Sequence, residues 1–242
     1  MEFSITQLIA ISAIFVWSGF VRAGLGFGGA ALALPLLLMV ADQPLFFLPI
    51  IAIHLLIFSS LTMKSGFKNI DVKFLKESMT WMIIPKFAGV IGLLSLPNEW
   101  MVWIIYAITG GYALTWILKW EIKSQSPWAD RIFYMLGGYF SGVSLIGAPL
   151  IVAVAVRKMA VSAYRDTLFV LWFVLVIIKL SAFALAGVDL QWQWSLILVI
   201  PTALGHVLGL KFHRFMLQYD PKIVRQGIGV GLLSVVFIAL FN

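Results

Sequence analysis

The hydrophobic positions of this chain gather in ten apolar segments that are separated by short polar stretches. The segments cover residues 4–21, 25–41, 45–63, 79–96, 100–118, 132–146, 148–156, 167–187, 194–210 and 226–241. Most of them approach the roughly 18 to 20 apolar residues that an α-helix needs to cross a bilayer. No polar stretch between them exceeds about 15 residues, the usual upper length of a connector. The pattern therefore predicts an all-α polytopic membrane protein without a separate soluble domain.

The basic residues divide the polar loops into two sets. If every segment reverses the side on which the chain lies, fourteen of the seventeen Lys and Arg residues fall on one side. They are Lys64, Lys68, Lys73, Lys76, Lys119, Lys123, Arg131, Arg157, Lys158, Arg165, Lys211, Arg214, Lys222 and Arg225. The other side carries Glu2, Asp42, Glu99 and Asp189 and no basic residue. Because Lys and Arg resist translocation, the basic side is predicted to be cytoplasmic, with both termini on the outer side of a bacterial cytoplasmic (inner) membrane.

The two halves of the chain share glycine and proline positions in the same order. The matched positions are Gly24 with Gly142, Pro85–Gly89 with Pro201–Gly205, and Gly92 with Gly209. Their offsets of 118, 116 and 117 residues are nearly constant. Since each half holds five segments, an odd number, the second half would be inserted upside down. The sequence therefore predicts two inverted repeats, residues 1–120 and 121–242, an architecture that is typical of secondary transporters.

Each predicted repeat begins with a glycine-rich break between two apolar segments. Residues 148–156 would rise only about 14 Å as a helix, against a hydrocarbon core of about 30 Å. We therefore expect broken-helix hairpins of two part-length helices that turn near the middle of the membrane. The turns are expected at residues 142–148 and at residues 22–29.

The glycines of these turns have two interpretations. Without side chains, they let an anion approach the unpaired backbone N–H groups at the start of the second arm, where the helix dipole favours negative charge. The hydroxyls of Ser141 and Ser144 would add donors. The candidate glycines are Gly24, Gly26, Gly28, Gly29, Gly142 and Gly147. Alternatively, small residues at these positions permit close packing between helices.

Three basic residues lie away from the polar loops, and all three are candidates for binding a substrate. They are Arg22, Lys86 and Lys179, and no Asp or Glu accompanies them inside any apolar segment. A cation in a bilayer costs a few kcal/mol and normally has a carboxylate or a water-filled cavity as its partner. The sequence therefore predicts that the partner is an anionic substrate. Two alternatives remain: Lys86 can snorkel to the cytoplasmic surface, and Arg22 would lie near that surface if residues 4–21 span the membrane fully.

Two histidines, His54 and His206, lie in apolar segments. Because histidine titrates near neutral pH, both are candidates for carrying a proton that is coupled to transport. The alternative is that each is a hydrogen-bonded core residue.

The remaining composition excludes several classes of function. The chain has no cysteine, which removes disulfides, thiolate chemistry and cysteine metal sites. A membrane-embedded enzyme would need a nucleophile with its base, or grouped metal ligands, and the apolar segments offer neither. No enzyme, metal or cofactor is therefore predicted. The net charge of +7 follows from the cytoplasmic loops and does not indicate nucleic acid. No G-x-x-x-x-G-K-[ST] motif is present, so ATP drive would require another subunit. The N-terminus, MEFSITQLIA, lacks a basic n-region and is expected to be a retained first segment.

The glycine and proline motifs resemble those of the sulfite exporter TauE/SafE family of membrane permeases. The first motif, G-x-G-x-G-G followed by a proline, consists of Gly24, Gly26, Gly28, Gly29 and Pro35, and the second consists of Ser141, Gly142, Gly147, Pro149 and Leu150. The resemblance covers nearly the whole chain and implies transport of sulfite, sulfonates, related sulfur oxyanions or small organic acids. The chain departs from the family pattern at Leu145 and Ala148, where glycine is usual, and Arg22 has no basic counterpart in the second half, where Phe140 lies.

These observations together predict a secondary transporter that moves a small sulfur oxyanion or organosulfonate by alternating access. The expected partners are the small anion and the lipid bilayer, and the sequence leaves a homo-oligomer open. The alternative is an anion channel or a non-transporting membrane subunit of a larger complex.

Overall fold

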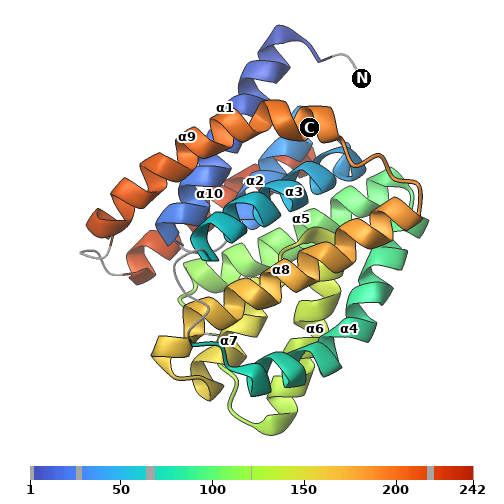
Figure 1. Cartoon of the computed structure of the whole chain (residues 1–242). Coiled ribbons are helices and arrows are strands. Elements are labelled where there is room, and N and C mark those ends of the chain that lie inside the picture. Colours follow the sequence, from blue (N-terminus) through green and yellow to red (C-terminus); the bar gives the residue numbers. More distant parts are fainter. Residues whose placement is uncertain (1–2, 26–28, 64–68, 121, 217–220, 242) are drawn as a thin grey trace. The chain divides into compact units, whose positions relative to one another are not determined.

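A computed structural model of the chain describes residues 3–25, 29–63, 69–120, 122–216 and 221–241. These residues form helices and no strand (Figure 1). The helices are α1 (Ile5–Leu25), α2 (Gly29–Val40), α3 (Pro44–Met63), α4 (Val72–Ser95), α5 (Asn98–Ile117), α6 (Pro127–Ser144), α7 (Ala148–Lys158), α8 (Val161–Leu185), α9 (Trp192–Met216) and α10 (Pro221–Phe241). Within the described residues, α1, α3, α4, α5, α8 and α9 are long and apolar enough to cross a membrane. The predicted all-α polytopic membrane fold is confirmed.

Helices α4 and α6 begin before the apolar segments that predicted them, because polar residues cap their first turns. The Asp71 carboxylate accepts a hydrogen bond from the backbone N–H of Phe74 at 2.9 Å, so α4 begins at Val72. The Ser126 hydroxyl accepts from the backbone N–H of Ala129 at 3.1 Å, so α6 begins at Pro127. Such caps satisfy N–H groups that have no partner inside the helix. Both helices therefore extend into stretches that hydrophobicity alone assigns to loops.

Each predicted hairpin has a short second arm. Helices α2 and α7 have 12 and 11 residues, which corresponds to lengths of about 18 and 16 Å. Helix α1, with 21 residues, is about 32 Å long, so the prediction of a part-length first arm is wrong for the first hairpin. Helix α6, with 18 residues, is about 27 Å long and is not among the helices that are long and apolar enough to cross a membrane. Arg22 consequently lies in the last turn of a long helix, and not at the tip of a short one. Helix α1 continues through Gly19 and Gly24 because α9 packs against it there.

The helices form two compact units, which are described separately. Unit 1 comprises Met1–Phe47, Pro97–Glu121 and Gln191–Asn242, and unit 2 comprises Leu48–Leu96 and Ile122–Leu190. In unit 1, α1 packs against α9 and α2, and α10 packs against α5 and α2. In unit 2, α4 packs against α6 and α8, and α7 packs against the same two helices. Each unit therefore contains helices from both predicted repeats, 1–120 and 121–242, and the duplication itself stays a prediction.

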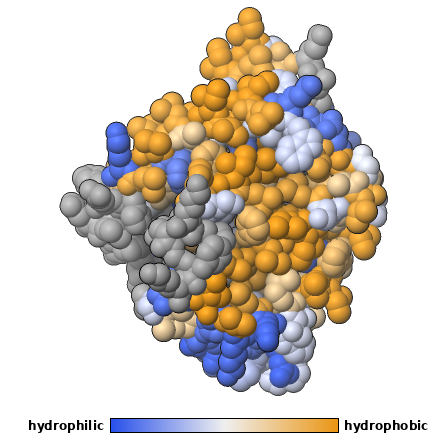
Figure 2. Space-filling model, in the orientation of Figure 1, coloured by the Kyte–Doolittle hydropathy of each residue, from blue (hydrophilic) through white to orange (hydrophobic). Residues whose placement is uncertain are grey.

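Apolar side chains lie both inside the units and on their surfaces. Unit 2 has a buried cluster that includes Met82, Tyr134 and Ile151, each 0% exposed. On the surface, Ile84 and Leu185 are 76% and 90% exposed, and Figure 2 shows that hydrophobic residues dominate the face drawn there. A soluble protein rarely exposes so much contiguous apolar area, whereas lipid tails cover it readily. The surface therefore agrees with a membrane location.

Two helix crossings, α1 with α9 and α4 with α6, depend on glycines. A Cβ atom on Gly205 of α9 would lie 1.8 Å from the carbonyl oxygen of Val16, and one on Gly19 of α1 would lie 2.1 Å from that of Thr202. In unit 2, a Cβ on Gly89 of α4 would lie 2.4 Å from the oxygen of Tyr139, and one on Gly142 of α6 would lie 2.3 Å from that of Lys86. The backbones at both crossings are thus too close for any side chain.

These contacts suggest how the two halves would correspond if the chain is duplicated. Gly205 and Gly89 make equivalent contacts at the predicted offset of 116 residues. Gly142 shares its contact with Gly19, however, and not with Gly24, which lies against Gly209. The corresponding stretches are then Trp17-Ser18-Gly19-Phe20 and Phe140-Ser141-Gly142-Val143. This alignment shifts α1 by five residues from the sequence-based one, because glycine spacing alone does not distinguish neighbouring turns.

We predict that a single methyl group at the closest crossing destabilises the protein. Gly205→Ala places a Cβ against the Val16 carbonyl, and the free energy of unfolding should fall by about 1–3 kcal/mol, the usual cost of overpacking. Gly231→Ala is the matched control, because nothing lies within 4 Å of its Cβ position on α10. Thermal unfolding in detergent measures both. Equal melting temperatures for the two variants would contradict the close crossing.

Candidate functional site

Two lysines of unit 2 are fully buried, and both hold the same helix end. Lys86 on α4 and Lys179 on α8 are 0% exposed. The Lys86 ammonium donates to the hydroxyl and carbonyl oxygens of Ser141, at 3.0 and 3.4 Å. The Lys179 ammonium donates to the carbonyl oxygens of Gly142 and Val143, at 2.6 and 3.0 Å. Lys86 therefore points into the protein, and the snorkelling alternative is wrong for it.

The lysines bind where α6 exposes its last carbonyl groups. The final four C=O groups of a helix have no intrahelical partner, and together they carry a partial negative charge. Helix α6 ends because Leu145 adopts the left-handed conformation, with φ of 62°, and its N–H returns to the Ser141 oxygen. The two ammonium groups satisfy the carbonyls of residues 141–143. They act as a cationic cap on a helix that ends in the protein interior.

The positive charge of this site exceeds what the helix end can neutralise. A helix C-terminus is equivalent to roughly half a negative charge, whereas two protonated lysines bring two positive charges. Every hydrogen-bond acceptor of the two lysines in the described residues is a carbonyl or hydroxyl oxygen, and none is a carboxylate. Because both ammonium groups bind residues 141–143, their positive charges also repel each other. An additional anion would complete the balance of charge.

The start of α7 lies next to this cationic cap. A Cβ on Gly147, the N-cap residue of α7, would lie 2.9 Å from the Cβ of Ser141, whose hydroxyl binds Lys86. No side chain caps this helix start, and Pro149 in its first turn needs no N–H partner. The remaining N–H groups of that turn have no partner inside the helix and favour an anion. The α6–α7 break thus brings two lysines and a helix N-terminus together.

The glycines and Ser144 at the break have packing roles in this structure. Gly142 lies against the α4 backbone, and a Cβ on Gly147 would lie 2.1 Å from the oxygen of Gly137. The Ser144 hydroxyl donates to the carbonyl oxygen of Phe140 at 3.1 Å, so its hydrogen is engaged within α6. Close helix packing, the alternative interpretation of these glycines, therefore accounts for Gly142 and Gly147. Their role in holding an anion stays a prediction.

The candidate residues of the first predicted hairpin form a second group, in unit 1. The Ser18 hydroxyl donates to the carbonyl oxygen of Gly29 at 3.2 Å, and a Cβ on Gly29 would lie 2.9 Å from the Cβ of Arg22. Arg22 is partly buried and acts electrostatically on His206 of α9. The structure thus brings Arg22, Gly29 and His206 into one neighbourhood.

Gly26 and Gly28, two further candidates, fall outside the described residues. His54 is buried on α3, where its imidazole packs edge-on against the Phe58 ring at 6.3 Å between centroids.

An ion-pair cluster that hydrophobic patterns did not indicate joins three helices of unit 2. The Asp130 carboxylate, 0% exposed in the first turn of α6, accepts from Arg157 Nε at 3.1 Å and forms an ion pair with Lys158 at 3.1 Å. Lys158 also pairs with Glu77 of α4, and the Ser124 hydroxyl donates to Asp130. This cluster fixes the end of α7 to the starts of α6 and α4. Asp130 lies just before the predicted segment 132–146, where hydrophobicity gives no signal. The cluster could have been indicated only by opposite charges at the two ends of the α6–α7 hairpin, with Asp130 at its start and Arg157 and Lys158 at its end.

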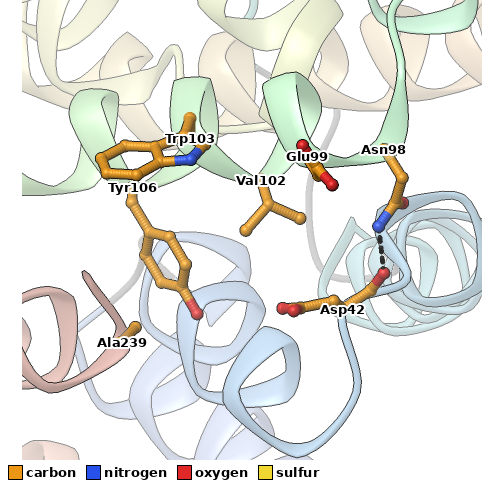
Figure 3. Close-up of a pocket in the computed structure, with 7 residues that line it drawn as sticks. All are labelled: Asp42, Asn98, Glu99, Val102, Trp103, Tyr106 and Ala239. Atoms are coloured by element: carbon orange, nitrogen blue, oxygen red, sulfur yellow. Dashed lines mark hydrogen bonds between the residues drawn. The ribbon is translucent and has the colours of Figure 1, made fainter. Parts of the chain in front are cut away.

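A cleft of about 140 Å³ lies in unit 1 (Figure 3). Asp42, Glu99, Trp103 and Tyr106 are among the residues that line it, and the Tyr106 hydroxyl donates to the carbonyl oxygen of Pro35 at 3.3 Å. Both of its charged groups are carboxylates, from loops predicted to lie on the outer side of the membrane. An acidic lining repels an anion, so this cleft does not fit the expected substrate.

We predict that the Asp130 cluster contributes measurably to stability. Asp130→Asn leaves Arg157 and Lys158 without their shared carboxylate, and we expect a loss of about 1–3 kcal/mol in the free energy of unfolding. This range lies below that of a fully buried pair because Arg157 and Lys158 remain 34% and 24% exposed. Glu77→Gln, which removes a pair of two partly exposed groups, should cost less. Thermal unfolding that ranks the two variants in the opposite order would contradict this account.

Comparison with known proteins gives one match that spans the chain. The sequence profile described as Sulfite exporter TauE/SafE matches residues 11–240. No curated protein and no solved structure matches the chain significantly. The match includes both helical hairpins and the two lysines that cap α6. The chain therefore belongs to the sulfite exporter TauE/SafE family of multi-pass membrane proteins.

Proposed function

We propose that this protein is a secondary transporter that moves a small sulfur oxyanion or organosulfonate across the cytoplasmic membrane by alternating access. The family is one of sulfite exporters, which supports a transporter in general. One observation supports the anion and its place: Lys86 and Lys179 are fully buried at one helix end, and none of their acceptors is acidic. The proposed substrate supplies the missing negative charge.

The geometry of the break suggests how the anion is held. Each ammonium has three N–H donors and uses two on α6, so one further donor remains on Lys86 for a substrate oxygen. The Lys179 ammonium also lies over the Phe183 ring, 5.2 Å from its centroid. The N–H groups of the first turn of α7 provide further donors of fixed direction. A tetrahedral or pyramidal oxyanion presents several oxygens and can bind to both. The break is closely packed at Gly147, so entry of the anion requires α7 to move relative to α6.

An anion that binds the folded protein should raise its melting temperature. We predict that sulfite, thiosulfate or sulfoacetate stabilises the purified protein more than lactate or taurine does, because the site requires net negative charge and several oxygens. A ligand at about a hundred times its Kd adds about 2.7 kcal/mol to the free energy of unfolding. Thermal unfolding with the sodium salts, at constant ionic strength, is the measurement. Stabilisation by cations alone would contradict the proposal.

Removal of either buried charge should abolish transport. We predict that Lys86→Met and Lys179→Met each lower counterflow of ³⁵S-labelled sulfite in proteoliposomes at least tenfold, because the anion loses its principal counter-charge. Lys73→Met is the matched control, since Lys73 is exposed in the first turn of the same helix as Lys86. Size-exclusion profiles and melting temperatures establish that the variants are folded. Flux at the wild-type level in folded Lys179→Met would remove this lysine from the site.

A further inference from the structure

The hydrogen bonds of the lysine pair in unit 2 do not require both lysines to be charged. Lys86 and Lys179 each make two hydrogen bonds to α6. A neutral amine has two N–H groups, so it can make the same number of bonds as the ammonium makes here. The Ser141 hydroxyl adds to this tolerance, because it can accept from an ammonium or donate to a neutral amine. These hydrogen bonds are therefore compatible with either protonation state of each lysine, whereas the Phe183 ring, 5.2 Å from Lys179 Nζ, favours its ammonium form.

The surroundings of the pair disfavour two full positive charges in the absence of an anion. Both side chains are 0% exposed, and an unpaired ion in such an environment is strongly disfavoured relative to its neutral form. Both Nζ atoms bind consecutive residues of α6, residues 141–143, so two ammonium groups there would repel each other. The helix end offers only partial negative charge. One or both lysines should therefore give up a proton when the site holds no anion.

The helices of unit 2 carry other titratable groups besides the pair. They are Lys73, Lys76 and Glu77 on α4, Asp130, Arg131, Tyr134 and Tyr139 on α6, Arg157 and Lys158 on α7, Tyr164, Arg165 and Asp166 on α8, and His54 on α3. Along their helices, Glu77, Arg131 and Asp166 are about 14, 15 and 20 Å from Lys86, Ser141 and Lys179. Along these helices, the carboxylates thus lie two or more helical turns from the lysines and from their acceptors on α6.

We propose that Lys86 and Lys179 take up a proton together with the anion, so that each transported anion is accompanied by at least one proton. This inference rests on the proposed function, and it assigns the coupling to the lysines and not to His54 or His206. The bound anion favours the ammonium form, and by reciprocity a proton on the pair strengthens binding of the anion. When the anion leaves on the other side, the pair returns its proton to water there. No bond other than N–H changes, and charge is conserved.

Coupling of this kind makes a pH gradient a source of energy for transport. One proton with each monovalent anion gives an electroneutral step, and a difference of one pH unit then supports about tenfold accumulation. A second proton would make transport sensitive to membrane potential as well. Export or import follows from which gradient the cell maintains.

The test uses the full chain in proteoliposomes and ³⁵S-labelled thiosulfate and sulfite as separate probes. Thiosulfate stays ionised between pH 6 and 8, so a proton that travels with it must be carried by the protein. Counterflow measures exchange, which needs no net proton movement, and uptake driven by a pH gradient at clamped membrane potential measures coupling. In the wild type, we expect accumulation toward the alkaline side to rise about tenfold or more per pH unit. Wild-type accumulation that ignores the pH gradient, while counterflow proceeds, would overturn the inference and leave the proposed function standing.

Variants identify the residues that carry the proton. Arginine stays protonated, so Lys86→Arg and Lys179→Arg should lower the ratio of pH-driven accumulation to counterflow at least tenfold, whatever the absolute counterflow. Lys73→Arg, on the exposed first turn of α4, should leave this ratio unchanged. An unchanged ratio in the folded Lys179→Arg and Lys86→Arg variants, or a ratio that falls only in His54→Gln or His206→Gln, would overturn the assignment to the lysines.

A direct measurement covers the case in which the arginine variants do not fold. Wild-type protein in weakly buffered detergent solution should take up about one to two protons per bound thiosulfate, as a pH-sensitive dye reports. Binding without proton uptake would overturn the inference alone. Absence of both binding and counterflow for both probes would overturn the proposed function, and the inference with it.

Discussion

Unit 2 depends on how the carbonyl end of α6 is neutralised inside the protein. Lipid provides no hydrogen-bond donor, so an unsatisfied backbone group at membrane depth costs several kcal/mol. Lys86 and Lys179 satisfy the carbonyls of residues 141–143 from two neighbouring helices. Lys86 lies on α4, and Gly89 and Gly142 let the backbone of α4 approach that of α6 closely next to this lysine. The glycines and the lysines thus belong to one structural device.

The same device explains why cations occur in a region without carboxylates. A helix end requires donors, which the lysines supply even without a substrate. Its partial negative charge is smaller than the charge of two ammonium groups, so the fully protonated pair favours an added anion. At the equivalent crossing of unit 1, Thr202 takes the position that Lys86 has in unit 2, judged by the contacts of Gly19 and Gly142. Threonine bonds its hydroxyl to the carbonyl oxygen of Leu198 at 2.7 Å and carries no charge. The two crossings share their packing, but only one of them combines it with buried lysines.

Most of the fold could be predicted from the sequence, because hydrophobic segments report helices directly. The ten predicted segments all correspond to helices, whereas the starts of α4 and α6 depend on the caps Asp71 and Ser126, which hydrophobicity does not detect. The candidate site was predicted in part: the missing carboxylates singled out Lys86 and Lys179. Their acceptors on α6 could not be predicted, because hydrogen bonds over 36 to 55 residues of separation depend on packing. The Asp130 cluster and the similar contacts of Gly19 and Gly142 also required tertiary structure.

The most direct test of this account is to locate a bound anion. Crystals or grids of the wild-type protein with selenate, a heavier analogue of the sulfur oxyanions, would show its position by anomalous scattering or density. The account predicts a selenium peak at the α6–α7 break, with oxygens within hydrogen-bond distance of Nζ of Lys86 and Lys179. A peak confined to the neighbourhood of Arg22 and His206, with both lysines still bound only to α6, would contradict it.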